Sequence, residues 1–190
     1  MDATSDSSAV AFSIGHGAAT QDELLARLAL GDIAFVVDIR TAPGSRRHPH
    51  LARDALQDWL PAAGVGYRWE PRLGGFRRPA ADSPDVVWRN ESFRGYAGHL
   101  RTPEAKDALE LLVQDATSRP TAYMCSETVW WRCHRRLVSD ALVLLWDLPV
   151  RHLMPGRVAE HEPTLGGRVT PEGLIYDDVD AAGDIPPQEG

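Results

Sequence analysis

The chain has 190 residues, of which 43% are apolar, so it is long enough to bury a core without disulfide staples. Its net charge is −7, and residues 158–190 carry all of that excess, which argues against tight non-specific nucleic-acid binding. No apolar run approaches the ~20 residues of a membrane span, and the first residues lack a signal-peptide pattern. We therefore expect a cytoplasmic protein with no membrane association.

The first part of the chain alternates predicted strands and helices. Residues 10–14 alternate apolar and small side chains and predict a strand. A capping-box pattern at Thr20 and Glu23 indicates the start of a helix. The nearly continuous apolar run over residues 33–39 is typical of a strand buried on both faces of a parallel sheet. Helical spacing over residues 51–60 and a short strand over 65–69 follow.

The second part continues this alternation after a long irregular segment over residues 71–90, and segments of that length are often functional. Thr102 and Pro103 indicate the start of another helix. Residues 121–125 predict a fourth strand, the apolar spacing over 137–145 predicts a last helix, and residues 150–154 predict a fifth strand. The rest reads as a meandering tail rich in Gly, Pro and acidic residues.

This alternation predicts a three-layer α/β fold with a mostly parallel sheet of about five strands and helices on both faces. We expect a disordered leader over residues 1–8, a single domain over 9–157 and an acidic tail over 158–190. Ligand sites in such sheets form at the carboxyl ends of the strands. That rule selects four polar clusters, at residues 15–17, 38–50, 73–78 and 125–136.

The most informative stretch is residues 121–145, which contain both cysteines of the chain. Cys125 leaves a predicted strand just before a loop and a helix N-terminus, where free N–H groups and the helix dipole stabilise a thiolate or an anion. Cys125 is therefore the candidate nucleophile or sulfur carrier. Asp38 or His134 is the candidate orienter or proton carrier. The alternative for Cys125 is a buried side chain that only packs.

The candidate binding residues are cationic, polar or aromatic groups near these clusters. Arginines at a helix N-terminus oppose the dipole, which suggests that they bind an anion or an acidic partner. The aromatic residues within 90–96 either stack on a flat ring or anchor the long segment. One of two adjacent tryptophans is expected to line the pocket. The predicted substrate-binding set is His16, Arg40, Arg46, Arg94, Tyr96, Glu127, Trp131, Arg132 and Arg135.

A metal site is a further alternative. Cys125, Cys133 and His134 offer suitable ligand types, but the spacing Cys-x7-Cys-His is not a usual zinc spacing. A core position is favoured for Cys133. No residue is therefore assigned as a metal ligand, and the sequence names no cofactor.

Several ordered motifs carry a resemblance to a known family. They are SIGHG at 13–17, VVDIR at 36–40, PGSRRHPH at 43–50, LGGFR at 73–77, FRGYAGHL at 93–100, MCSE at 124–127 and WRCHRRLVSDAL at 131–142. On these motifs the chain resembles the family called domain of unknown function 488. The resemblance implies a compact α/β domain with a pocket built from the motifs. The chain differs from the family pattern at Gly17 and at Trp130.

The layout of the cysteine loop is also similar to rhodanese-like and phosphatase-like sites. In those enzymes the loop surrounds an anion with backbone N–H groups and lowers the pKa of the thiol. We therefore expect an enzyme, a thiol-dependent transferase or hydrolase, that acts on a small anionic or nucleotide-like molecule. The alternatives are a metal-binding domain and a non-catalytic nucleotide or nucleic-acid binding module. In that module Arg46, Arg47, Arg77, Arg78 and Arg94 would contact phosphates.

Overall fold

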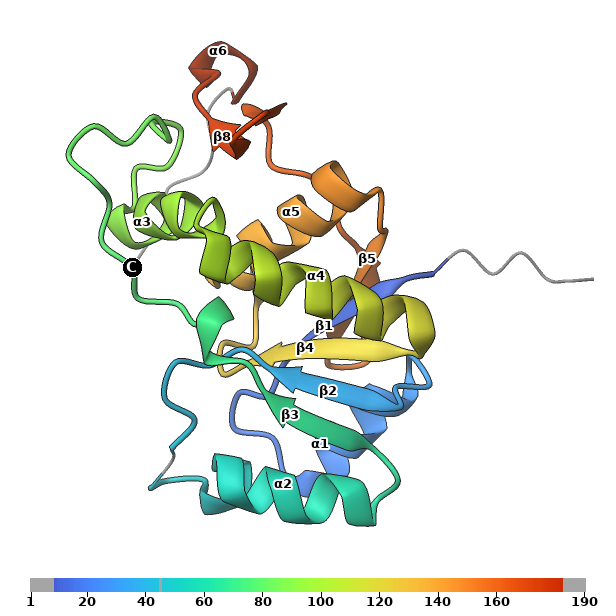
Figure 1. Cartoon of the computed structure of the whole chain (residues 1–190). Helices are drawn as coiled ribbons and strands as arrows, with labels where there is room; N and C mark the ends of the chain where they lie inside the picture. The colour runs from blue at the N-terminus through green and yellow to red at the C-terminus, as the bar shows by residue number, and fades with distance from the viewer. Residues whose placement is uncertain (1–8, 45, 183–190) are drawn as a thin grey trace, which may run out of the picture.

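The computed structural model describes residues 9–44 and 46–182, so the predicted leader over 1–8 lies outside the described residues. Its centre is a six-stranded sheet in the order β3-β2-β4-β1-β5-β6 (Figure 1). Five strands are parallel, and β6 adds an antiparallel edge beside β5. The strands are β1 (Ala11–Gly15), β2 (Phe35–Asp38), β3 (Gly66–Trp69), β4 (Thr121–Cys125), β5 (Val150–Met154) and β6 (Arg157–Glu160).

Helices cover both faces of this sheet, as Figure 1 shows. Helices α1 (Gln21–Ala29) and α2 (Arg53–Ala62) lie on one face, and α4 (Pro103–Ser118) and α5 (Arg135–Trp146) lie on the other. The predicted capping box begins α1, with the N–H of Glu23 donating to Thr20 Oγ1 at 3.2 Å. The predicted three-layer α/β fold with a mostly parallel sheet is confirmed.

Strand alternation divides the core into two clusters, one on each face of the sheet. Ile14 and Met124 pack with Leu24 on the side of α1 and α2. Tyr123 and Cys125 pack with residues of α4 and α5 on the opposite side. Asp38 shares the face of Val36, so the ends of β2 and β4 present Asp38 and Cys125 to different layers at the same edge of the sheet.

The irregular segment over 71–90 contains one short 3-10 helix, η2 (Pro71–Leu73), and then leads into a helix that the sequence analysis did not predict, α3 (Glu91–Leu100). Asn90 caps α3 by accepting the N–H of Phe93 at 3.2 Å. Two glycines within it lower its helix propensity, which obscured the pattern. Phe93 and Tyr96 are buried, so the aromatic residues of this segment anchor it to the core.

The acidic segment after β5 also forms elements that its composition did not predict. Besides β6, it contains the hairpin β7 (Gly167–Thr170) and β8 (Gly173–Tyr176), and the short helix α6 (Val179–Ala182). Tyr176 is fully buried, and Arg101 joins the hairpin to the long segment by binding both Asp85 and the carbonyl of Leu174. Within residues 9–44 and 46–182, no helix has the length and apolar character that crossing a membrane requires.

Candidate functional site

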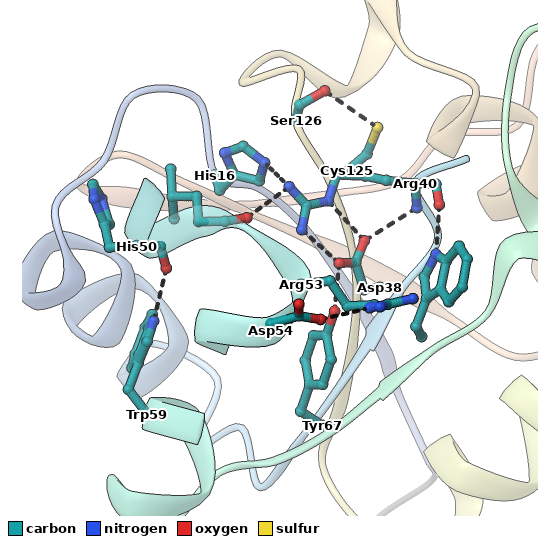
Figure 2. Close-up of polar contacts among 12 residues, drawn as sticks. His16, Asp38, Arg40, His50, Arg53, Asp54, Trp59, Tyr67, Cys125 and Ser126 are labelled. Carbon is teal, nitrogen blue, oxygen red and sulfur yellow. Dashed lines mark hydrogen bonds and ion pairs between the residues drawn. The ribbon is translucent and has the colours of Figure 1, made fainter. Parts of the chain in front are cut away.

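A cavity of about 660 Å³ opens where β1, β2 and β4 end. The predicted site residues that line it are His16, Arg40, Tyr96, Cys125, Glu127, Arg132 and His134, and Cys133 lines it as well. Residues far apart in the sequence therefore meet at one edge of the sheet, and the cavity lies directly over Cys125. Figure 2 shows His16, Arg40 and Cys125 at this edge.

Arg40 is held by an ion pair that lies behind the cavity wall. Its Nε and Nη2 donate to the two carboxylate oxygens of Asp38 at 2.8 and 2.6 Å (Figure 2). Tyr67 Oη donates to the same carboxylate at 2.7 Å, and burial and the Asp38 charge raise the pKa of Tyr67 well above its ordinary value. Asp38 is fully buried and does not line the cavity, so it orients Arg40.

His16 is a neutral imidazole with a fixed tautomer. Its Nδ1 bonds to the carbonyl of Gly17 at 2.8 Å, so Nδ1 donates and Nε2 accepts from Arg40 Nη1 at 2.9 Å. Burial, followed by the charge of Arg40, lowers the pKa of His16 to about 4. Arg40 Nη1 also donates to the carbonyl of Leu51 at 2.9 Å. At least four of the five N–H groups of Arg40 are thus used within the protein.

The loop after β4 approaches the end of β1 closely. The N–H groups of His16 and Gly17 donate to the carbonyls of Cys125 and Ser126 at 3.0 and 2.9 Å. Gly17 has a φ of 55°, and a Cβ atom there would lie 2.3 Å from Thr128 Oγ1. This crowding explains why the chain has glycine at the position where it departs from the family pattern.

Cys125 and Cys133 are free, buried and next to each other at the cavity wall, with 7% and 4% exposure. Burial alone would raise the pKa of Cys133. The hydrogen bond from Cys125 and the charge and N–H groups of Arg135 outweigh burial and lower that pKa to about 6. The hydrogen bond to Cys133, together with burial, raises the pKa of Cys125. Both pKa shifts favour negative charge on Cys133 over Cys125, in the same direction as the contact of Cys133 with Arg135.

Arg135 is the cationic group that contacts Cys133. Only 1% of Arg135 is exposed, and its Nε donates to Cys133 Sγ at 3.4 Å. Its Nη2 donates to the carbonyls of Glu127 and Thr128. Within the described residues no carboxylate forms an ion pair with Arg135. A buried cation needs an anionic partner, and the Cys133 sulfur is placed to be that partner.

His134 completes this group of atoms. Its Nδ1 lies 3.6 Å from Cys133 Sγ, and its Nε2 is buried without a hydrogen-bond partner among the described atoms. Its ring meets Tyr96 edge-on, and a Cβ at Gly75 would lie 2.9 Å from its Nδ1. The ring is thus held firmly at the cavity wall beside Cys133, with one nitrogen still available.

The same atoms could hold a soft metal ion, because both sulfurs and a nitrogen of His134 lie within 4.8 Å of one another. A divalent ion there would sit beside the buried guanidinium of Arg135. The charges of two ligating thiolates would cancel that of the ion, so no net negative charge would remain to pair with the guanidinium. The geometry therefore favours a thiolate paired with Arg135 over a bound metal.

Other predicted residues lie away from the cavity lining. Arg46 is exposed, Arg94 is half-buried on α3, and Trp131 is 40% exposed and meets Trp130 edge-on. Asp38 and Arg135 stand behind the cavity wall. Phe76 and Phe93 also line the cavity; Phe76 was not among the residues predicted from the sequence, and Phe93 was expected there only as a stacking or anchoring residue. The position of Cys133, two residues before Arg135 at a helix start, did not reveal their contact, because no spacing encodes where the Arg135 side chain points.

Comparison with known sequences gives the family. The sequence model described as Domain of unknown function DUF488 matches residues 20–142. Comparisons with curated proteins and with solved structures gave no match. The matched span covers more than half of the chain and includes Asp38, Arg40 and the whole cysteine loop. The expected resemblance is confirmed, and the chain belongs to the family Domain of unknown function DUF488.

Proposed function

We propose that this protein is a thiol-dependent enzyme that acts on a small anionic or nucleotide-like molecule in the cavity, with Cys133 as the nucleophile. The observation that carries the proposal is the contact between Cys133 Sγ and the buried guanidinium of Arg135 at 3.4 Å. A cation and a helix N-terminus beside a thiol are the surroundings that activate cysteines. Cys125 is the nucleophile expected from the sequence, but its hydrogen bond to Cys133 and its burial raise the pKa of Cys125, which favours Cys133 for this role.

The cavity offers recognition groups for such a substrate. Arg40 and Arg132 at the lining supply positive charge for an anionic group. Phe76 lines the same cavity and is 92% exposed, with a φ of 61°. A left-handed backbone at an aromatic residue costs about 1 kcal/mol or more, and such strain is typical of functional sites. An exposed phenyl ring at the cavity suits a ligand with a flat ring.

The roles follow from these positions. Cys133 Sγ would attack the electrophilic atom of the substrate and displace its leaving group. His134 Nδ1 lies 3.6 Å from Cys133 Sγ, so His134 is placed to carry the proton of the leaving group or of the incoming acceptor. Asp38 holds Arg40, and Arg40 in turn holds His16 at the cavity wall. The reaction is a group transfer to water or to another acceptor.

Thiol alkylation as a function of pH tests this proposal. Iodoacetamide should modify one thiol of the folded protein at neutral pH, with a rate midpoint near pH 6, as the lowered pKa of Cys133 requires. Cys125→Ser should keep this fast reaction, because a serine hydroxyl still donates to the thiolate, whereas Cys133→Ser should abolish it. If neither thiol of the folded protein reacts at neutral pH, the nucleophile role is refuted.

A further inference from the structure

A chain of buried hydrogen bonds leads from Arg135 away from the cavity. Arg135 Nη1 donates to Ser13 Oγ at 3.4 Å, and Ser13 Oγ lies 2.7 Å from His152 Nδ1. His152 Nε2 lies 3.0 Å from His161 Nδ1, and His161 Nε2 lies 2.8 Å from Asp140 Oδ1. The five residues come from β1, α5, β5 and the segment after β6.

The Asp140 carboxylate gives this chain a single direction. A carboxylate only accepts, so His161 donates through Nε2 and must accept through Nδ1. His152 then donates through Nε2 and accepts through Nδ1, which leaves Ser13 to donate its hydroxyl hydrogen to His152. The Ser13 oxygen is consequently free to accept from Arg135. Every donor in the chain thus meets an acceptor.

The surroundings keep the His152 ring neutral and fixed. Ser13, Asp140 and His152 are fully buried, and burial, followed by His161 and Arg135, lowers the pKa of His152 to about 2. Trp130 stacks on His152 with ring centroids 4.1 Å apart. Asp140 is fixed further by the N–H of Thr164 and by Tyr176 Oη at 2.9 and 2.7 Å. A buried polar network destabilises a protein unless each of its members forms hydrogen bonds, and each member of this chain does so.

We propose that Ser13, His152, His161 and Asp140 form a positioning chain that holds the Arg135 guanidinium against Cys133 and so sets the reactivity of the thiol. The inference rests on the proposed function, because it concerns the same thiolate. It assigns a role to residues outside the cavity and makes His161, in the acidic segment, a working part of the site. These four are positioning residues, because none of them lines the cavity.

Several other titratable groups face Arg135 or Cys133 and remain unchanged when a substitution interrupts the hydrogen-bond chain. They are His16, Tyr96, Tyr123, Cys125 and His134. A substitution that removes the Ser13 hydroxyl takes one hydrogen-bond acceptor away from Arg135. A substitution at His161 removes the group that fixes the His152 tautomer. Either change loosens the guanidinium and should raise the pKa of Cys133.

The test measures the pH midpoint of iodoacetamide alkylation in the full-length Cys125→Ser protein, where Cys133 is the remaining cysteine. Ser13→Ala and His161→Phe should each raise the midpoint by about one pH unit, which lowers the rate at pH 6 about fivefold. Ser13→Thr, which keeps the hydroxyl, should restore the original midpoint. Tyr176→Phe is the matched control, because it removes a buried bond to Asp140 that does not lie between Asp140 and Arg135.

The outcomes separate this inference from the proposed function. The midpoint before any chain substitution tests the proposed function, whereas the change in midpoint tests the positioning chain. If Ser13→Ala and His161→Phe lower the melting temperature but leave the midpoint in place, as Tyr176→Phe should, the network is only packing and the inference is overturned. Imidazole 15N spectra give a second measurement that needs no variant. Protonation of His152 at Nδ1 would also overturn the inference, because the Ser13 oxygen would then accept from His152 and its hydroxyl would no longer donate to that ring.

Discussion

Removing the carboxylate of Asp38 should destabilise the protein severely. This carboxylate accepts hydrogen bonds from Arg40 Nε, Arg40 Nη2, the Arg40 N–H and Tyr67 Oη, at distances between 2.6 and 3.1 Å. Asp38→Ala would leave a buried guanidinium without a counter-charge, because both members of the pair are buried. Breaking one partner of a buried ion pair typically costs about 3–5 kcal/mol. Because domains are stable by about 5–15 kcal/mol, that loss takes a large share of the total.

Urea denaturation followed by tryptophan fluorescence measures this loss. Asp177→Ala is the matched control, because Arg168 binds Asp177 through Nε and Nη2 at 2.7 and 2.6 Å, the same geometry on the surface. The control should shift the urea midpoint far less, since exposed pairs are screened by water. Equal losses in the two variants would refute the argument that burial makes the Asp38 pair important.

Three further predictions follow from the site. The pKa of His16 falls from 6.5 to about 4 on folding, so the unfolding free energy should decrease by up to about 3 kcal/mol as the pH falls from 6.5 toward 4. His16→Asn should flatten this pH dependence in urea titrations. An unchanged dependence in the variant would contradict the prediction. Phosphate should protect Cys133 from alkylation, and Arg132→Ala should weaken this protection about tenfold. Arg157 is exposed and outside the cavity, so Arg157→Ala is the control and should leave the protection unchanged. Equal protection in the two variants would show that Arg132 does not bind the anion. Elemental analysis of protein purified without a tag should find much less than one metal ion per chain, and a full equivalent would restore the metal-site alternative.

The sequence predicted the sheet well because its signals are local. Strands β4 and β5 lie at the predicted residues 121–125 and 150–154, where short apolar runs are bounded by proline or loop residues. Helix α3 escaped prediction because Gly95 and Gly98 break the helical pattern. The hairpin β7–β8 escaped prediction because β7 has exposed residues and neither short strand alternates apolar and polar side chains clearly. In both cases tertiary packing, through residues such as Tyr176, outweighs weak local preference.

The edge of the sheet at which the site forms was predictable from strand order alone, but the contacts within it were not. His16, Arg40 and Cys125 follow strand ends and therefore had to meet there. Which cysteine carries the charge depends on the direction in which the buried Arg135 side chain points, and no spacing encodes that direction. Ser13 and His152 are 139 residues apart, and each alone looks like an ordinary strand residue.

The position of β1 has a consequence for the order of folding. β1 is the earliest strand in the chain, yet it lies between β4 and β5, with Ala11 paired to both Thr121 and Val150. More than a hundred residues must therefore be made before either edge of β1 finds its partner, whereas β2 and β3 can pair much sooner. Folds dominated by such distant pairings form slowly, and their unpaired strand edges are exposed to aggregation meanwhile. During synthesis β1 thus remains an apolar segment with two open edges, so the chain depends on protection at its first strand until its fifth has been made.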